Sequence, residues 1–62
     1  MILEQIIEQE NKLLAKNIIP EYIYLSYDDF LNLIKETGLS KFTNKFHMCK
    51  IVIQKNKKVL VT

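Results

Sequence analysis

Hydrophobic residues recur at helical spacing over the first part of the chain, residues 2–16. Ile7 and Leu14 are seven positions apart, so they lie on one stripe of a helix. Glu10 interrupts that stripe, because it falls between these two residues on the apolar side. The pattern predicts an amphipathic helix, and Asn17 is a suitable residue to end it.

A short strand is predicted next, over residues 21–25, after a proline that forces extended backbone. Its residues alternate, with Ile23 and Leu25 on one face and Tyr22 and Tyr24 on the other. We expect the two tyrosines to pack under the N-terminal helix, and a role as a binding platform is the alternative.

A second helix is predicted to begin at Ser26 and to end at Gly38. Ser26 is a good N-cap, and the carboxylates of Asp28 and Asp29 lie in the first turn, where the helix dipole favours them. Adjacent residues of a helix project about 100° apart, so this pair does not converge on one cation. We interpret both aspartates as capping residues, and Gly38 as the residue past the helix end.

The last third of the chain predicts a loop over residues 40–46, a strand over 47–54, a turn over 55–57 and a final strand over 58–62. The expected fold is therefore α+β, with an N-terminal helix followed by β-α-β-β. We expect a small three-stranded, mostly antiparallel sheet packed by the helices, in a single domain spanning 1–62.

Both strands of the expected C-terminal hairpin are apolar without alternation, at residues 51–53 and 59–61. Both faces of that hairpin then require cover, and one short helix covers only one of them. The final strand also ends the chain and is expected at a sheet edge, where it can pair with another chain. We predict a homo-oligomer whose interface contains Ile2, Leu3, Ile6, Ile7, Leu13, Leu14, Val59 and Val61.

Composition supports this prediction, because 62 residues bury only a small core. A single Cys excludes an intramolecular disulfide, and one Cys with one His excludes a conventional zinc site, so self-association is the remaining common means of stabilisation. The sequence has no apolar run of membrane-spanning length and does not start like a signal peptide. We expect a cytoplasmic protein without a cofactor.

Charge is unevenly distributed: residues 39–62 contain six lysines and no acid, whereas residues 1–38 contain three lysines and seven acids. Lysines with interleaved aromatics favour nucleic-acid binding, but they also protect strand edges or attract an acidic partner surface. The absence of arginine argues against a sequence-specific DNA reader. The candidate nucleic-acid residues are Lys41, Phe42, Lys45, Lys50, Lys55, Lys57 and Lys58.

His47 and Cys49 are two apart on a predicted strand, so their side chains share one face. A Cys–His nucleophile pair or a partial metal site requires this arrangement, with Asp28 or Glu36 as the acid that approaches in space. A buried thiol beside a partly exposed histidine explains the pair more simply. We therefore expect no catalytic residue and no metal site.

Residues 19–33 contain a Pro that leads into a short strand, followed by Ser-x-x-Asp and an aromatic that open a helix. This segment resembles an element of small phage-encoded proteins and of some phage capsid-type domains. The resemblance, with a composition typical of an AT-rich genome, implies an accessory protein of a phage or mobile element in a low-GC host. It carries over no site residue. The expected function is non-enzymatic self-association and protein–protein binding, and the alternative is weak nucleic-acid binding.

Overall fold

The computed structural model describes residues 1–55 and 58–62 and confirms the α+β class. Its elements are α1 (Ile2–Ala15), β1 (Tyr22–Leu25), α2 (Tyr27–Thr37), β2 (Lys45–Phe46), β3 (Cys49–Ile53) and β4 (Leu60–Val61). The described chain thus contains one strand more than the sequence predicts.

The sheet has the strand order β2-β3-β1-β4, which differs from the expected C-terminal hairpin. β1 lies between the two strands of that hairpin, parallel to β3 and antiparallel to β4. Ile23 and Leu25 are fully buried, and the central position gives the backbone of this buried strand hydrogen-bond partners on both sides. The expected turn at 55–57 lies partly outside the described residues, at positions 56 and 57.

The additional strand, β2, pairs with β3 through a two-residue turn at His47 and Met48. Both turn residues have left-handed backbone, with φ of 49° and 65°. A two-residue hairpin turn favours this conformation, although Asn and Gly normally supply it. The predictions of a loop extending through Phe46 and a strand starting at His47 were therefore wrong at this point.

The two ends of α1 are closed in different ways. At its C-terminus Asn17 is left-handed, with φ 61°, and the N–H of Ile18 donates to the carbonyl of Leu13 at 2.9 Å, as in a Schellman ending. At its N-terminus the Glu36 carboxylate of α2 accepts from the first two backbone N–H groups, at 3.3 and 3.1 Å. One helix therefore caps the other.

The predicted limits of α2 are confirmed. Ser26 Oγ accepts from the backbone N–H of Asp29 at 3.2 Å, which is the expected N-cap bond. Gly38 has φ 72° and donates its N–H to the carbonyl of Ile34 at 2.8 Å. Both ends are set by local hydrogen bonds.

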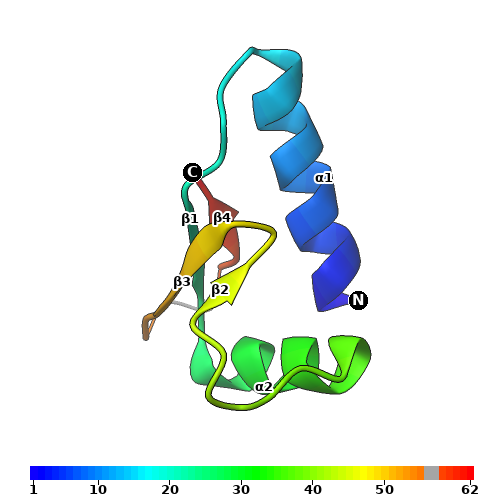
Figure 1. Cartoon of the computed structure of the whole chain (residues 1–62), viewed down its shortest axis with the longest axis vertical. Helices are drawn as coiled ribbons and strands as arrows, with labels where there is room; N and C mark the ends of the chain where they lie inside the picture. Colours follow the sequence, from blue (N-terminus) through cyan, green and yellow to red (C-terminus); the bar gives the residue numbers. More distant parts are fainter. Residues whose placement is uncertain (56–57) are drawn as a thin grey trace.

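One face of the sheet is covered by the helices, with α1 running along it and α2 crossing its end (Figure 1). The buried core of this layer consists of Ile2, Ile6, Ile23, Leu25, Phe30, Leu33, Cys49 and Val61. Among the described residues, no helix or strand covers the opposite face of the sheet. The sheet therefore has one packed face and one open face.

The outer edge of β4 is closed by the side chain of Gln9 from α1. Its Nε2 donates to the carbonyl of Val59 at 2.7 Å, and its Oε1 accepts from the N–H of Val61 at 2.9 Å. The amide thus bonds the edge as a neighbouring strand does, and these two groups are satisfied within the chain.

Candidate interaction surfaces

Glu10, His47 and Cys49 form a polar cluster between α1 and the β2–β3 hairpin. Oε1 of Glu10 lies 3.0 Å from Nδ1 of His47, and Oε2 lies 3.8 Å from Sγ of Cys49. The Glu10 side chain is 11% exposed, whereas that of His47 is 48% exposed and stacks on Phe46, with ring centroids 3.9 Å apart. Because an ionised carboxylate only accepts hydrogen bonds, Nδ1 of the imidazole carries the donor hydrogen in this contact.

The environment of Cys49 favours the neutral thiol. Burial raises its pKa, and the nearby Glu10 carboxylate raises it further through its charge and by accepting a hydrogen bond. Sγ also lies 3.6 Å from the carbonyls of Pro20 and His47. A thiolate nucleophile requires a lowered pKa and access, so this site lacks the electrostatics of a reactive cysteine.

The acid that reaches His47 and Cys49 is Glu10, and neither Asp28 nor Glu36 takes that place. The signal was present in the sequence, as the carboxylate that interrupts the apolar stripe of the first helix. Among the residues that the structure describes, no group of three or more His, Cys, Asp or Glu side chains is arranged to hold a metal ion.

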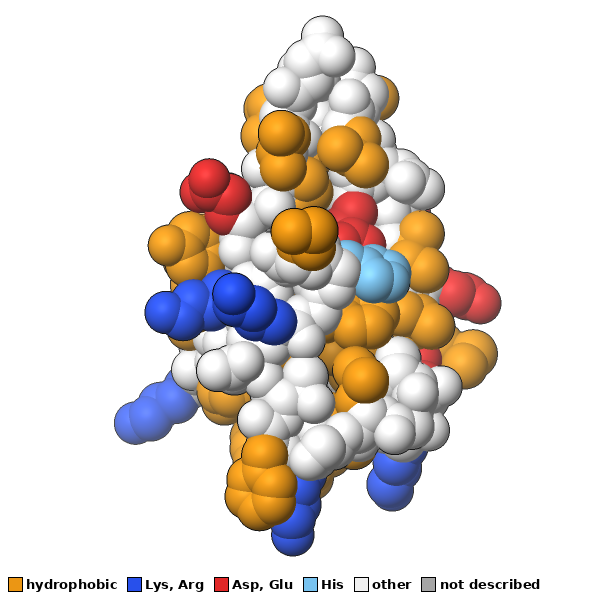
Figure 2. All heavy atoms as spheres, in the orientation of Figure 1, with side chains coloured by type: hydrophobic (Ala, Val, Ile, Leu, Met, Phe, Trp, Pro, Cys, Tyr) orange, Lys and Arg blue, Asp and Glu red, His pale blue; other side chains and the backbone are white. Residues whose placement is uncertain are grey.

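An apolar groove of about 460 Å³ lies over this cluster, between α1, the segment that enters β1, and the β2–β3 turn. It is lined by Ile7, Glu10, Asn11, Leu14, Ile19, Pro20, His47 and Met48. Figure 2 shows the pale-blue histidine beside an acidic side chain with hydrophobic side chains around them. The exposed fractions of Leu14, Ile19 and Met48 are 53%, 79% and 94%, so these side chains are without cover.

The open face of the sheet carries six side chains in two rows. Lys45, Lys50 and Tyr22 are register partners across β2, β3 and β1, and Val52, Tyr24 and Leu60 are partners across β3, β1 and β4. The Tyr22 and Tyr24 rings are 6.1 Å apart. We refer to these six residues as the open sheet face.

The prediction that Tyr22 and Tyr24 pack under the N-terminal helix was wrong. Successive strand residues point to opposite faces, and Ile23 and Leu25 occupy the helix-facing side. The tyrosines therefore lie on the open sheet face.

The predicted interface residues are divided between the core and the surface. Ile2, Ile6 and Val61 are buried in the chain's own core, and Leu3, Leu13 and Val59 pack against it. Ile7 and Leu14 remain exposed, at 38% and 53%, and both line the groove. Of the eight candidates these two are the exposed ones, whereas Leu3, Leu13 and Val59 are half-buried.

The lysines of the last third that the structure describes do not lie on one surface. Lys45 and Lys50 lie side by side on the open sheet face, whereas Lys41 is in the loop after α2, 5.7 Å from the ring of Phe42. Lys55 lines a separate cavity, Lys58 follows the undescribed positions, and Lys57 lies outside the described residues. The structure brings two of the predicted nucleic-acid residues together, and it adds two tyrosines that the sequence did not connect with them.

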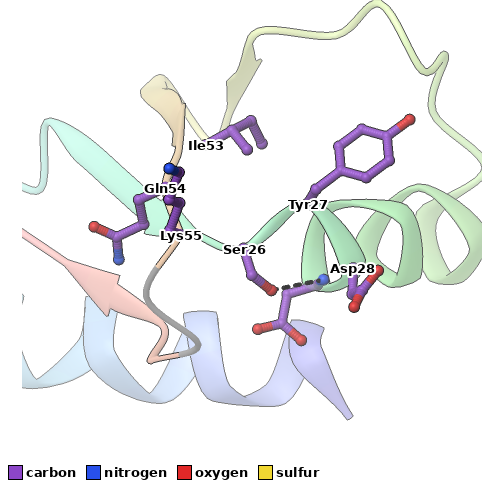
Figure 3. Close-up of a pocket in the computed structure, with 7 residues that line it drawn as sticks. Ser26, Tyr27, Asp28, Ile53, Gln54 and Lys55 are labelled. Atoms are coloured by element: carbon purple, nitrogen blue, oxygen red, sulfur yellow. Dashed lines mark hydrogen bonds between the residues drawn. The ribbon is translucent and has the colours of Figure 1, made fainter.

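The cavity that contains Lys55 lies at the start of α2, beside the ends of β1 and β3, and measures about 590 Å³. Figure 3 shows Asp28 and Lys55 on opposite sides of it and Ser26 bonded to the first helical turn. Asp28 and Asp29 complement the positive end of the helix, as predicted. The first turn therefore already has carboxylates, which disfavours an added anion.

No family model matches this chain, and neither a curated protein nor a solved structure matches it. Within the described part of the chain, neither α1 nor α2 has the length and apolar character that crossing a bilayer requires.

Proposed function

We propose that this chain is a non-enzymatic interaction protein that self-associates through the groove on α1. The observation that carries the proposal is the uncovered apolar lining of that groove, formed by Ile7, Leu14, Ile19 and Met48. Exposed apolar side chains gathered on one surface mark protein–protein contacts.

A second copy of the chain is the partner that fits this surface. Ile7 and Leu14 are seven positions apart, so they form one stripe along the outside of α1. The same stripe on a second copy packs against it in an antiparallel, two-fold contact. A standard interface buries about 800 Å² per partner. This area is roughly a sixth of the chain's accessible surface of 4648 Å², so one side of the molecule is large enough to provide it.

Glu10 is compatible with such a contact although it lies on the groove. Closing an apolar surface over an unpaired carboxylate is costly. Here the carboxylate already contacts the imidazole of His47 and the thiol of Cys49, so a second copy covers a charge that has its partners.

Sedimentation velocity at micromolar concentrations tests the proposal. We expect the wild-type chain to sediment as a dimer and Leu14→Glu to sediment as a monomer, because the new carboxylate is buried in the contact without a partner. Leu60→Glu is the matched control, since Leu60 has nearly the same exposed fraction, 51% against 53%, and lies on the open sheet face. A monomeric wild-type chain, or dissociation by the Leu60 variant alone, overturns the groove as the interface.

A further inference from the structure

We propose that the open sheet face binds single-stranded nucleic acid. The proposal does not rest on self-association, because this face lies on the side of the sheet opposite α1. The site consists of Tyr22 and Tyr24 on the central strand and Lys45 and Lys50 beside them.

The two tyrosines provide surfaces on which bases stack. Their rings are 6.1 Å apart and tilted by 35°, and Tyr22 is 39% exposed. Tyr24 is half-buried, and no described helix or strand covers the side of the sheet on which the two rings lie. Stacking on aromatic side chains requires unpaired bases, which favours a single strand over a duplex.

The two lysines supply the charge that a phosphate backbone requires. Lys45 and Lys50 are directly opposite each other in the β2–β3 pair, and like charges in that position destabilise a sheet. A phosphate bound between them removes this repulsion. Lys50 is also the register partner of Tyr22, so a base on that ring has Lys50 on the neighbouring strand and Lys45 one strand further, in the same row. Figure 2 shows lysine side chains lying together on the sheet side of the molecule.

The residue types also define the kind of recognition. Lysine contacts phosphate as a point charge, and stacking on tyrosine accepts any base. The face contains no Asn, Gln or Arg to read base edges, so binding depends on the strand and its backbone more than on its sequence. The ligand class is a flexible single strand of DNA or RNA.

Fluorescence anisotropy with labelled oligo(dT) and oligo(U) tests the proposal, and the two probes distinguish DNA from RNA. We expect binding at low ionic strength that weakens as salt is added. In the double variant Lys45→Gln/Lys50→Gln the slope of log K against log[salt] falls in magnitude by about 1.4, because each lost phosphate contact contributes about 0.7. Lys35→Gln is the matched control, since it removes an exposed lysine from α2.

Substitution of the tyrosines is expected to change the affinity without changing its salt dependence. Tyr22→Ala is expected to weaken binding about 5- to 150-fold at constant salt while leaving the salt slope unchanged, because stacking involves no counterion. Tyr24→Leu keeps an apolar side chain on the sheet and provides a second variant, with folding of both checked by circular dichroism. Leu14→Glu should bind like the wild type, which separates this proposal from self-association.

Three outcomes overturn the proposal. They are the absence of salt-sensitive binding of either probe, equal binding by the wild type and the lysine double variant, and loss of self-association in the tyrosine variants without any binding of oligonucleotide. The last result assigns the open sheet face to a second copy of the chain.

Discussion

Oε1 of Glu10 lies 3.0 Å from Nδ1 of His47, and this contact joins the middle of α1 to the turn between β2 and β3. His47 and the following residue, Met48, both have left-handed backbone, which is unfavourable for residues other than glycine. A buried carboxylate therefore holds a turn that its own sequence does not favour. It also forms the floor of the groove.

Replacement of Glu10 by Ala should lower the free energy of unfolding by about 1–3 kcal/mol, because the imidazole and thiol lose their acceptor. Urea denaturation measures this loss. Glu8→Ala is the control on the same helix, since it removes only an exposed pair to Lys12 at 3.5 Å and should cost less than about 0.5 kcal/mol. Adding His47→Ala gives a double-mutant cycle, and strictly additive losses contradict a direct contact.

Cys49 should react with iodoacetamide slowly at neutral pH in the folded protein and faster only under alkaline conditions, because burial and Glu10 raise the thiol pKa. Because the pKa of the Cys49 thiol is higher in the folded than in the unfolded protein, the neutral thiol favours the folded state at every pH below the ordinary thiol pKa. That contribution is lost as the pH rises through the folded-state pKa, so stability should fall in the alkaline range. Glu10→Gln removes the charge and should shift the reactivity profile to lower pH. Equal alkylation rates in the folded and the urea-unfolded protein contradict this account.

Gln9→Ala should destabilise the protein by about 1–3 kcal/mol, because the N–H of Val61 and the carbonyl of Val59 lose their partners at the edge of β4. Hydrogen exchange gives the specific readout, since the Val61 amide should exchange faster. Gln5→Ala, one turn earlier on an exposed part of α1, should change stability by less than about 0.5 kcal/mol. Unchanged protection of Val61 in the Gln9 variant argues against the edge bond.

Met48→Gly should stabilise the monomer by about 1 kcal/mol, because glycine adopts the left-handed φ of 65° without strain. The same change removes a 94% exposed apolar side chain from the groove, so self-association should weaken. Gly38→Ala is the converse: its φ is 72° and open space surrounds it, so the backbone alone should cost about 1 kcal/mol. A Met48→Gly change that lowers stability in thermal denaturation in the Leu14→Glu background, where self-association is already removed, contradicts the strain at the turn.

The limits of the helices were predictable because the signals are local. Ser26, Gly38 and Asn17 each act within a few residues through a cap bond or a left-handed backbone. The alternation over Tyr22–Leu25 likewise predicts that two residues face one way and two the other. The alternation alone does not say which of these two faces packs against the helices. Ile23 and Leu25 were the better candidates for burial because their side chains are aliphatic.

The candidate surfaces were predictable only in part. Glu10 was conspicuous as a carboxylate on an apolar stripe, and His47 and Cys49 as a pair two apart, but 37 and 39 positions separate them from Glu10. Nothing in the hydrophobic pattern of either segment indicates that Glu10 lies beside His47 and Cys49 in the folded chain. The two turn residues also lack the Asn-Gly signature that would have shown the β2–β3 hairpin.

The sequence by itself determined the α+β class, the two amphipathic helices, their ends and the excess of lysine in the last third, because these depend on spacing and on neighbouring residues. Only the tertiary structure decided that β1 separates β3 from β4, that Gln9 closes the β4 edge, and that two tyrosines share a face with Lys45 and Lys50. The physical reason is that strand pairing joins residues distant in the chain. Each strand can pair in several ways, and burial of Ile23 and Leu25 in the middle of the sheet selects one of them.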